Sequence, residues 1–243
     1  MGALSKGFAI IDAVTAAGDG LSFSGIVERT GLPKASAHRL LKELVELSAL
    51  TFDPATKHYR GGLRLARFGA AVTAGYNVRR VARPQLEQLN EATGSVATLG
   101  IRDGENGIYI DKIEPDDFVI RVHSEIGKSF PLHCTAMGKV LLAHSDAASR
   151  RNIMRRKLRA FTDNTITDPD TLRAELDDVL DKGYAIDREE ITRGLVCVAA
   201  PIYGLDGDVE AAMSCTISSF DADRPRLEDT ITLVRQAAQK ASP

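Results

Sequence analysis

The sequence lacks the features that define several classes of protein. It has only three cysteines, Cys134, Cys197 and Cys215, an odd number without the paired spacing of a zinc ribbon. A disulfide framework is therefore not expected, and the thiols are predicted to be reduced and mostly buried. No apolar run approaches the roughly 20 residues that a membrane-spanning helix needs, and no signal-peptide cleavage pattern follows the first apolar stretch. We therefore expect a cytoplasmic protein with no membrane partner.

A strong overall charge is also absent, because the 243 residues carry a formal net charge of only -2. That value alone would disfavour a nucleic-acid binder, but the charge is unevenly distributed. Residues 1–83 contain twelve Lys or Arg against six Asp or Glu, whereas residues 84–243 contain nineteen against twenty-seven. A basic first part and an acidic second part predict two units with separate functions.

Helical periodicity and turn residues divide the first sixty residues into three helices and a hairpin. Apolar residues recur at helical spacing up to Gly18 and Gly20, and Ser24 is the predicted cap of a second helix that stops at Gly31. Pro33 suits the start of a third helix, in which the apolar positions of KASAHRLLKELVE fall three and four apart. LTFDPATKHYR follows with an Asp-Pro turn, which predicts a hairpin.

The exposed side at the beginning of the third helix is basic and hydroxylic. Two short helices joined by a Gly-containing turn and followed by a basic hairpin are typical of a winged helix-turn-helix, whose second helix enters the DNA major groove. Base edges and phosphates need donors and cations, which this helix and hairpin supply. The alternative is a small helical subdomain whose polar face is only solvated. The candidate DNA contacts are Lys34, Ser36, Ala37, His38 and Arg39 in the helix, with Lys57, His58 and Arg60 in the hairpin.

Residues 63–93 are predicted to form a helical linker. Its apolar residues recur three and four apart, with an expected kink at Pro84: Leu65, Phe68, Val72, Tyr76, Val81, Leu86 and Leu89. A stripe that one small domain cannot cover is typical of subunit pairing, and a homodimer would place two DNA-reading heads on one duplex. The alternative is that the stripe packs on its own chain.

From residue 94 onward, short strands alternate with helices. Strands are expected in SVATLGIRDG, NGIYIDKIE, FVIRVHSE, YAIDREE, LVCVAAPIY and VEAAMSCTI. Helices are expected in HCTAMGKVLLAH, ASRRNIMRRKL, TDPDTLRAELDDVLDKG and DRPRLEDTITLVRQAAQKA. This pattern predicts an α+β domain of ordinary size. The predicted division is residues 1–62 for DNA binding, 63–93 for the linker and dimerisation, and 94–243 for the α+β domain.

Two kinds of chemical site can be considered in this second part. His133, Cys134 and Asp187 are the residue types of a cysteine hydrolase, but adjacent strand residues face opposite sides and nothing in the sequence brings Asp187 to His133. His123, His133, Cys134 and Cys197 could ligate a metal, but they lack a diagnostic spacing. We therefore expect no catalytic site, no metal and no cofactor.

A binding site is suggested where SFPLHCTAMGKVLLA passes from an extended stretch into a helix. The N–H groups near Ala136 and Met137 lack partners within that helix and lie at the positive end of its dipole, which suits a carboxylate. The alternative is an ordinary helix start capped by Thr135.

Three parts of the chain together resemble the IclR family of transcriptional regulators, called after the isocitrate lyase regulator. They are LSKGFAIIDAV with TGLPKASAHRLLKEL, then PLHCTAMGKVLLA, and GYAIDREEITRGLVCVAAPIY, which follows the family's effector-domain signature from Gly183 to Tyr203. Gly204 departs from the pattern, which usually has Asp or Asn there, and we expect this to alter only the following turn. The resemblance covers nearly the whole chain.

The resemblance implies a winged helix-turn-helix, a dimerising helical linker and a C-terminal GAF-like mixed α/β domain that binds an effector. It also implies a ligand-responsive regulator, which we expect to be a repressor of a catabolic operon, with double-stranded operator DNA as partner and dimers that commonly pair into tetramers. Lys6 joins the residues expected near DNA. Carried over position by position, the effector contacts are Val119, Val122, Ala136, Met137, Asp187, Leu195, Cys197, Ser214 and Thr216.

Asp187 imposes a condition on that effector. A carboxylate beside the bound carboxylate repels it, unless Asp187 is protonated or accepts a hydrogen bond from a ligand hydroxyl. We therefore expect a small acid that also carries a hydroxyl or enol group. Ser214 and Thr216 alternate along one strand and face the same side, so their hydroxyls can donate to such a ligand. The alternative class of function is an enzyme or a stand-alone sensor with a vestigial helical head.

Overall fold

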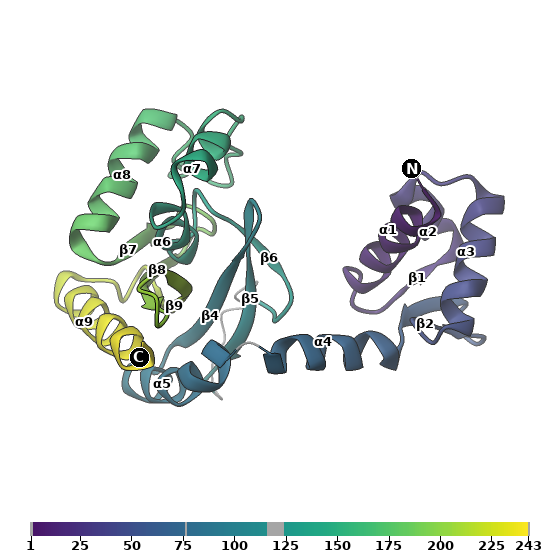
Figure 1. The fold of residues 1–243 in the computed structure, drawn as a ribbon, viewed down its shortest axis with the longest axis horizontal. Coiled ribbons are helices and arrows are strands. Elements are labelled where there is room, and N and C mark those ends of the chain that lie inside the picture. The colour runs from purple at the N-terminus through teal and green to yellow at the C-terminus, as the bar shows by residue number, and fades with distance from the viewer. Residues whose placement is uncertain (1, 76, 116–123, 243) are drawn as a thin grey trace. The chain divides into compact units, whose positions relative to one another are not determined.

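The structure is a computed structural model, and it describes residues 2–75, 77–115 and 124–242. The chain divides into two compact units, Met1–Gly75 and Tyr76–Pro243 (Figure 1). Each unit buries its own set of apolar side chains. In the ranges just given, no helix is long and apolar enough to cross a membrane.

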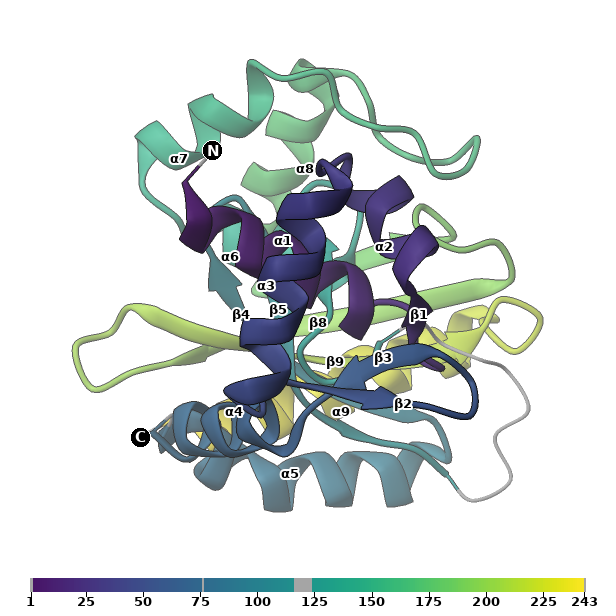
Figure 2. The ribbon, with the colours of Figure 1, turned by 90° about the vertical axis from the view of Figure 1, so that its right-hand side faces the viewer.

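The first unit is a three-helix head with a small antiparallel sheet of order β1-β3-β2. Its core contains Ile10, Ile26 and Leu41, one from each of the three helices, and all three are nearly inaccessible to solvent. Helix α3 leads directly into the β2–β3 hairpin (Figure 2). The elements in chain order are α1 (Ala3–Thr15), β1 (Leu21–Ser22), α2 (Phe23–Thr30), α3 (Lys34–Glu46), β2 (Leu50–Asp53), β3 (His58–Gly61) and α4 (Leu63–Gly75).

Local hydrogen bonds explain where the short elements of this head begin and end. The prediction that Ser24 caps the second helix was wrong, because the Ser22 Oγ accepts the Gly25 N–H at 3.3 Å and α2 begins at Phe23. Gly31 ends α2 with a φ of 63°, a left-handed conformation that glycine adopts without steric cost. The hairpin turn is held by the Asp53 carboxylate, which accepts the Ala55 N–H at 2.9 Å.

The apolar face of α1 is narrower than its sequence suggests. Ile10 and Val14 are buried, whereas Leu4 and Phe8 are 77% and 57% exposed. The head is small, so α2 and α3 cover only one side of α1. The predicted winged helix-turn-helix architecture is confirmed, and part of the apolar stripe on α1 lies at the surface of this unit.

The predicted linker is divided between the two units. Helix α4 belongs to the first unit, while α5 (Asn77–Thr93) belongs to the second and continues through Pro84. Leu86 and Leu89 are buried in the core of the second unit, as expected if this part of the stripe packs on its own chain. In contrast, Phe68 on α4 is 55% exposed. The two halves of the stripe therefore have different surroundings.

The second unit is a six-stranded antiparallel sheet of order β6-β5-β4-β9-β8-β7 with helices on both faces (Figure 1). Helices α5 and α9 pack on one face, and α6 and α8 on the other. On β4, Leu99 packs toward α5 and α9, while Thr98 faces the α6 side. The remaining elements are β4 (Val96–Asp103), β5 (Asn106–Ile113), β6 (Ser129–Pro131), α6 (Ala136–Ala143), α7 (Ala147–Met154), α8 (Pro169–Lys182), β7 (Ala185–Arg188), β8 (Leu195–Tyr203), β9 (Val209–Ser218) and α9 (Arg224–Ala241).

The order of strands and helices in this unit agrees with the α+β prediction. The expected strand FVIRVHSE falls mostly on residues 116–123, which lie outside the described residues. The strand that pairs with the outer side of β5 is β6, which is only three residues long. It lies in the stretch before α6 that was predicted to be extended, but its pairing with β5 was not predicted.

The start of α6 packs against the preceding backbone without room for a side chain at Gly138. A Cβ atom there would lie 2.4 Å from the Pro131 carbonyl oxygen and 2.7 Å from the Leu132 Cα. Both obstacles are backbone atoms, which cannot rotate away. Glycine at this position therefore brings the first turn of α6 close to the sheet.

We expect Gly138→Ala to lower the free energy of unfolding by about 1–3 kcal/mol, the usual cost of overpacking. Gly69→Ala in α4 is the control, because its Cβ would meet no atom within 4 Å and should stabilise the helix by roughly 0.5–1 kcal/mol. Urea unfolding followed by circular dichroism measures both changes. An unchanged unfolding midpoint for Gly138→Ala would contradict the tight packing.

Candidate functional site

The exposed beginning of α3 carries most of the predicted DNA contacts. Lys34, His38 and Arg39 are exposed, and Ser36 is half-buried. The Arg39 Nη1 lies 2.8 Å from the Glu43 Oε1, but both side chains are at least half exposed. An ion pair in that setting contributes little stability, so the guanidinium can exchange Glu43 for another partner.

Ala37 does not belong to this face. Its side chain is fully buried beneath α3, in the core of the head, so its prediction as a DNA contact is corrected. Helical geometry explains the burial, since residue 37 lies on the same side as Leu40 and Leu41. In contrast, the His38 ring stands edge-on to Phe23 at 6.2 Å between centroids and is exposed.

The remaining predicted contacts lie on the hairpin and on α1. Lys57 and Arg60 are exposed and His58 is half-buried in the wing. Lys6 is half-buried on α1. Lys57 has a φ of 57°, so the tip of the hairpin turns sharply at a basic residue.

In the second unit, a cavity of about 60 Å³ lies between the sheet and the start of α6. It is far smaller than the roughly 300–1,000 Å³ of pockets that hold drug-sized ligands. Its walls combine hydroxyl groups, apolar side chains and one carboxyl. The lining residues are Thr98, Tyr109, Ser124, Thr135, Ala136, Met137, Asp187, Ile191, Thr192, Leu195, Cys197, Ser214 and Thr216.

Strand register brings the polar side chains of the floor into two neighbouring rows on one face of the sheet. Thr216 on β9 is opposite Cys197 on β8, and Cys197 is opposite Asp187 on β7. On the other side of β9, Ser214 is opposite Thr98 on β4. Residues that are opposite each other across neighbouring strands share one face of the sheet. Four strands, β4, β9, β8 and β7, therefore form a continuous polar floor.

The start of α6 supplies the roof. The Thr135 Oγ1 accepts the Gly138 N–H at 3.0 Å, and the Thr135 carbonyl accepts the Lys139 N–H at 2.9 Å. Neither the Ala136 N–H nor the Met137 N–H donates a hydrogen bond to any residue that the structure describes. Both of these residues line the cavity. The predicted cap and the predicted free donors are therefore both present at this helix start.

Asp187 is the only carboxyl group among the described lining residues, and it is 1% exposed. Its Oδ1 accepts the Glu190 N–H at 2.7 Å. Burial raises the pKa of the Asp187 carboxyl to about 7, and the nearby charge of Glu190 adds to this effect while that of Lys139 opposes it. Near neutral pH, the carboxyl is therefore divided between its protonated and ionised forms.

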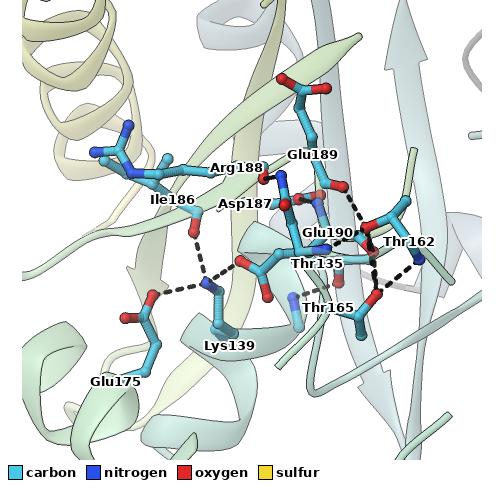
Figure 3. Close-up of polar contacts among 12 residues, drawn as sticks. Thr135, Lys139, Thr162, Thr165, Glu175, Ile186, Asp187, Arg188, Glu189 and Glu190 are labelled. Atoms are coloured by element: carbon cyan, nitrogen blue, oxygen red, sulfur yellow. Dashed lines mark hydrogen bonds and ion pairs between the residues drawn. The ribbon is translucent and has the colours of Figure 1, made fainter. Parts of the chain in front are cut away.

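Beside the cavity, Lys139 forms a buried ionic cluster that joins α6 to α8 and β7 (Figure 3). Its Nζ lies 2.7 Å from Glu175 Oε1, 2.7 Å from Glu190 Oε1 and 2.6 Å from the Ile186 carbonyl oxygen. All three hydrogens of the ammonium group thus have an acceptor. The ammonium is fully occupied by these partners, so it is not available to a ligand.

The segment after β7 is held by two threonines from the loop before α8 (Figure 3). The Thr162 Oγ1 donates to the Glu189 carbonyl at 2.7 Å, and the Thr165 Oγ1 donates to the Glu190 carbonyl at 2.6 Å. Glu189 has a positive φ of 61°, an uncommon conformation for a residue other than glycine. These contacts fix the backbone that continues into the cavity wall at Ile191.

Seven of the nine predicted effector contacts line this one cavity. The other two, Val119 and Val122, lie outside the described residues. Sequence reasoning did not identify Thr98, Tyr109 or Ser124 as wall residues, and it overlooked Lys139. The signal for Lys139 was a lone cation in the otherwise apolar helix AMGKVLLA. The seven contacts placed together are Ala136, Met137, Asp187, Leu195, Cys197, Ser214 and Thr216.

The residue types considered for catalysis do not form a catalytic arrangement. The His133 Nε2 is 3.0 Å from the Arg159 carbonyl oxygen, and His133 does not line the cavity. Burial raises the pKa of the Cys134 thiol well above its usual range, with the charges of Asp187 and Glu190 adding to it, which disfavours the nucleophilic thiolate. Within the described ranges, no three His, Cys, Asp or Glu residues are grouped to hold a metal ion, and His123 lies outside them.

Comparison with known proteins agrees with both units. Residues 3–54 match the model of the IclR helix-turn-helix domain, and residues 70–243 match that of the bacterial transcriptional regulator IclR C-terminal domain. The chain is 31% identical over 242 residues to the DNA-binding transcriptional repressor YiaJ of Escherichia coli, covering 98% of this chain and 86% of that protein. It is 32% identical over 241 residues to the transcriptional regulator BhcR of Paracoccus denitrificans, covering 99% and 86%.

Solved structures show the same fold. An IclR transcriptional regulator from Alicyclobacillus acidocaldarius aligns with a TM-score of 0.87 and 27% identity over 99% of this chain and 97% of its own. An IclR homolog from Microbacterium hydrocarbonoxydans, solved in complex with 4-hydroxybenzoate, aligns with a TM-score of 0.87 and 23% identity over 99% and 98%. From the two domain matches and the full-length relatives, the chain belongs to the IclR family of bacterial transcriptional regulators.

Proposed function

We propose that this regulator is a repressor that binds operator DNA through its head and a small organic acid through the cavity in its second unit. The observation that carries the proposal is the cavity itself, where two N–H groups of α6 that have no acceptor among the described residues meet a floor of hydroxyl groups. We infer that the acid releases or strengthens repression of a catabolic operon, in the cytoplasm. In this division, residues 1–62 read DNA, 63–93 connect and pair the subunits, and 94–243 bind the acid.

In the head, we assign base recognition to His38 and Arg39, because both are exposed at the beginning of α3. An arginine can bind the O6 and N7 atoms of a guanine with two hydrogen bonds. Lys34, Ser36 and Lys6 are assigned to phosphate contacts. The wing contributes Lys57, His58 and Arg60 to the adjacent backbone.

We also propose a homodimer in which α4 helices meet, with tetramers formed by pairing of dimers. Leu63 and Phe68 on α4 are 82% and 55% exposed in the single chain, which leaves apolar surface for a second copy. Two heads on one duplex bind a roughly palindromic site more tightly and selectively than one head does. The effector can change the affinity for DNA only if it binds more tightly to a dimer with one distance between the two heads than to a dimer with another distance.

For the effector, the Ala136 and Met137 N–H groups are assigned to its carboxylate. The second condition comes from Asp187, which is either protonated or accepts a hydrogen bond from a ligand hydroxyl. Because its pKa is about 7, the Asp187 carboxyl is protonated at lower pH. At higher pH it is ionised and can accept the hydrogen bond from the ligand hydroxyl. We therefore propose an acid that carries both a carboxylate and a hydroxyl or enol group.

The proposal predicts salt-sensitive binding to DNA from the region upstream of the gene. Fluorescence anisotropy should show specific binding that weakens steeply as salt increases, because phosphate contacts release counterions. One member of a panel of small carboxylic acids, including 4-hydroxybenzoate, should alter that binding. Failure to bind both this DNA and any fragment from a genomic selection would favour a stand-alone sensor or an enzyme instead.

Arg39→Ala should weaken operator binding by about 1–3 kcal/mol, because a bidentate contact to guanine is lost. Arg224→Ala is the matched control, since Arg224 pairs with Glu228 at 2.8 Å with the same four-residue spacing on a helix of the second unit. It should leave operator binding unchanged. Binding of the acid, measured by calorimetry, should be unaffected in both variants. A loss of both activities in Arg39→Ala would indicate misfolding rather than a lost base contact.

Asp187→Asn should change which acids bind and remove their pH dependence. The raised pKa means that the Asp187 carboxyl is neutral below about pH 7 and ionised above it. In the wild type, affinity for a simple acid should therefore fall by up to about tenfold per pH unit above pH 7. The variant keeps an oxygen acceptor for the Glu190 N–H and should show no such fall.

The control for this comparison is Asp103→Asn, an exposed position at the end of β4. Calorimetric titrations with the same acids between pH 6 and pH 8.5 measure both properties. If Asp187→Asn has the selectivity and the pH profile of the wild type, the role assigned to Asp187 is wrong.

A further inference from the structure

Ser124 contributes a buried hydroxyl group that the fold does not use. It is 1% exposed, it lines the cavity, and its Oγ has no hydrogen-bond partner among the described residues. Leaving a buried hydroxyl unpaired is costly, so such groups in native proteins usually bind water, an ion or a ligand. Because Ser124 lies in a cavity wall, a molecule bound in the cavity can supply that partner.

Tyr109 contributes a second hydroxyl to the same cavity from β5. Its ring packs against Phe130 with 4.6 Å between centroids, which orients the phenol. The hydroxyl makes no hydrogen bond to any residue in the described part of the chain. Burial raises the pKa of the Tyr109 phenol well above its usual range, with Cys197 and Asp187 adding to it, so the phenol keeps its proton and acts as a donor.

The charges around the cavity limit what these hydroxyls can hold. The described lining residues include no Lys, Arg or His, and the nearest ammonium, that of Lys139, already has three acceptors. The α6 start offers two free N–H groups, enough for one carboxylate. Among the described lining residues, none carries a cation that could balance a second carboxylate buried near Asp187, and such an unbalanced charge is unfavourable.

We propose that the effector is a small monocarboxylic acid with an uncharged hydroxyl group, and that Ser124 and Tyr109 recognise this hydroxyl while α6 holds the carboxylate. The inference rests on the proposed binding of an acid in this cavity and adds its specificity-determining residues. The hydroxyl accepts hydrogen bonds from Ser124 and Tyr109 and can donate its own proton to Asp187. The small cavity, of about 60 Å³, favours a compact acid.

Calorimetry on the full chain with four matched three-carbon probes tests this assignment. The probes are propanoate, lactate, 3-hydroxypropanoate and malonate. At least one hydroxy acid should bind about tenfold more tightly than propanoate, the usual effect of one added hydrogen bond in a buried site. Malonate should bind no better than propanoate.

Ser124→Ala and Tyr109→Phe should each reduce the preference for the hydroxy acid by about fivefold or more, while binding of propanoate stays unchanged. Ser129→Ala and Tyr184→Phe are the matched controls, because neither residue lines the cavity. Thermal unfolding without ligand separates this role from a structural one. Ser124→Ala should unfold at the wild-type temperature or above it, since the removed hydroxyl has no partner among the described residues.

Three results would overturn the inference. They are equal binding of propanoate and the hydroxy acids, an unchanged preference in both cavity variants, and no binding of any of the four probes at 10 mM or below. Fluorescence anisotropy, which measures binding to operator DNA, distinguishes a failure of the hydroxy-acid assignment from a failure of the proposed regulator function. If a larger acid alters DNA binding, the regulator proposal stands and only the hydroxy-acid assignment falls.

Discussion

The second unit depends on the buried ammonium group of Lys139. It lies 2.6–2.7 Å from three acceptors that come from α8, from β7 and from the segment after β7. Removing one member of such a buried cluster would leave an uncompensated charge, at a cost of about 3–5 kcal/mol. The cluster thus holds the cavity wall that contains Asp187 at a fixed distance from α6.

The same cluster influences the chemistry of the cavity. Lys139 is a single cation that Glu190 and Glu175 already share, so Asp187 has no cation of its own among the described residues. Together with burial, this surplus of negative charge explains why the Asp187 carboxyl titrates near neutral pH. In the proposed binding mode, the start of α6 serves as the anion site in place of a basic side chain.

Much of this arrangement was predictable from the sequence, because it depends on short-range patterns. The Thr135 cap, the Gly183 stop of α8 and the Asp-Pro turn of the wing are each decided by a few neighbouring residues. The pattern could not tell which side of an amphipathic helix is covered. Leu4 and Phe8 on α1 have the same spacing as buried residues, yet they are exposed because the small head has nothing to pack over them.

The sequence by itself determined the order of elements, the division into a basic and an acidic part and the family, since these follow from local periodicity and long motifs. Only the tertiary structure decided that Ala37 is buried, that Lys139 is neutralised within the chain, and that Ser124 and Tyr109 line one cavity. Each of these facts depends on which strands and helices lie side by side. Strand pairing joins residues more than a hundred positions apart, and such pairings cannot be predicted from the local sequence pattern.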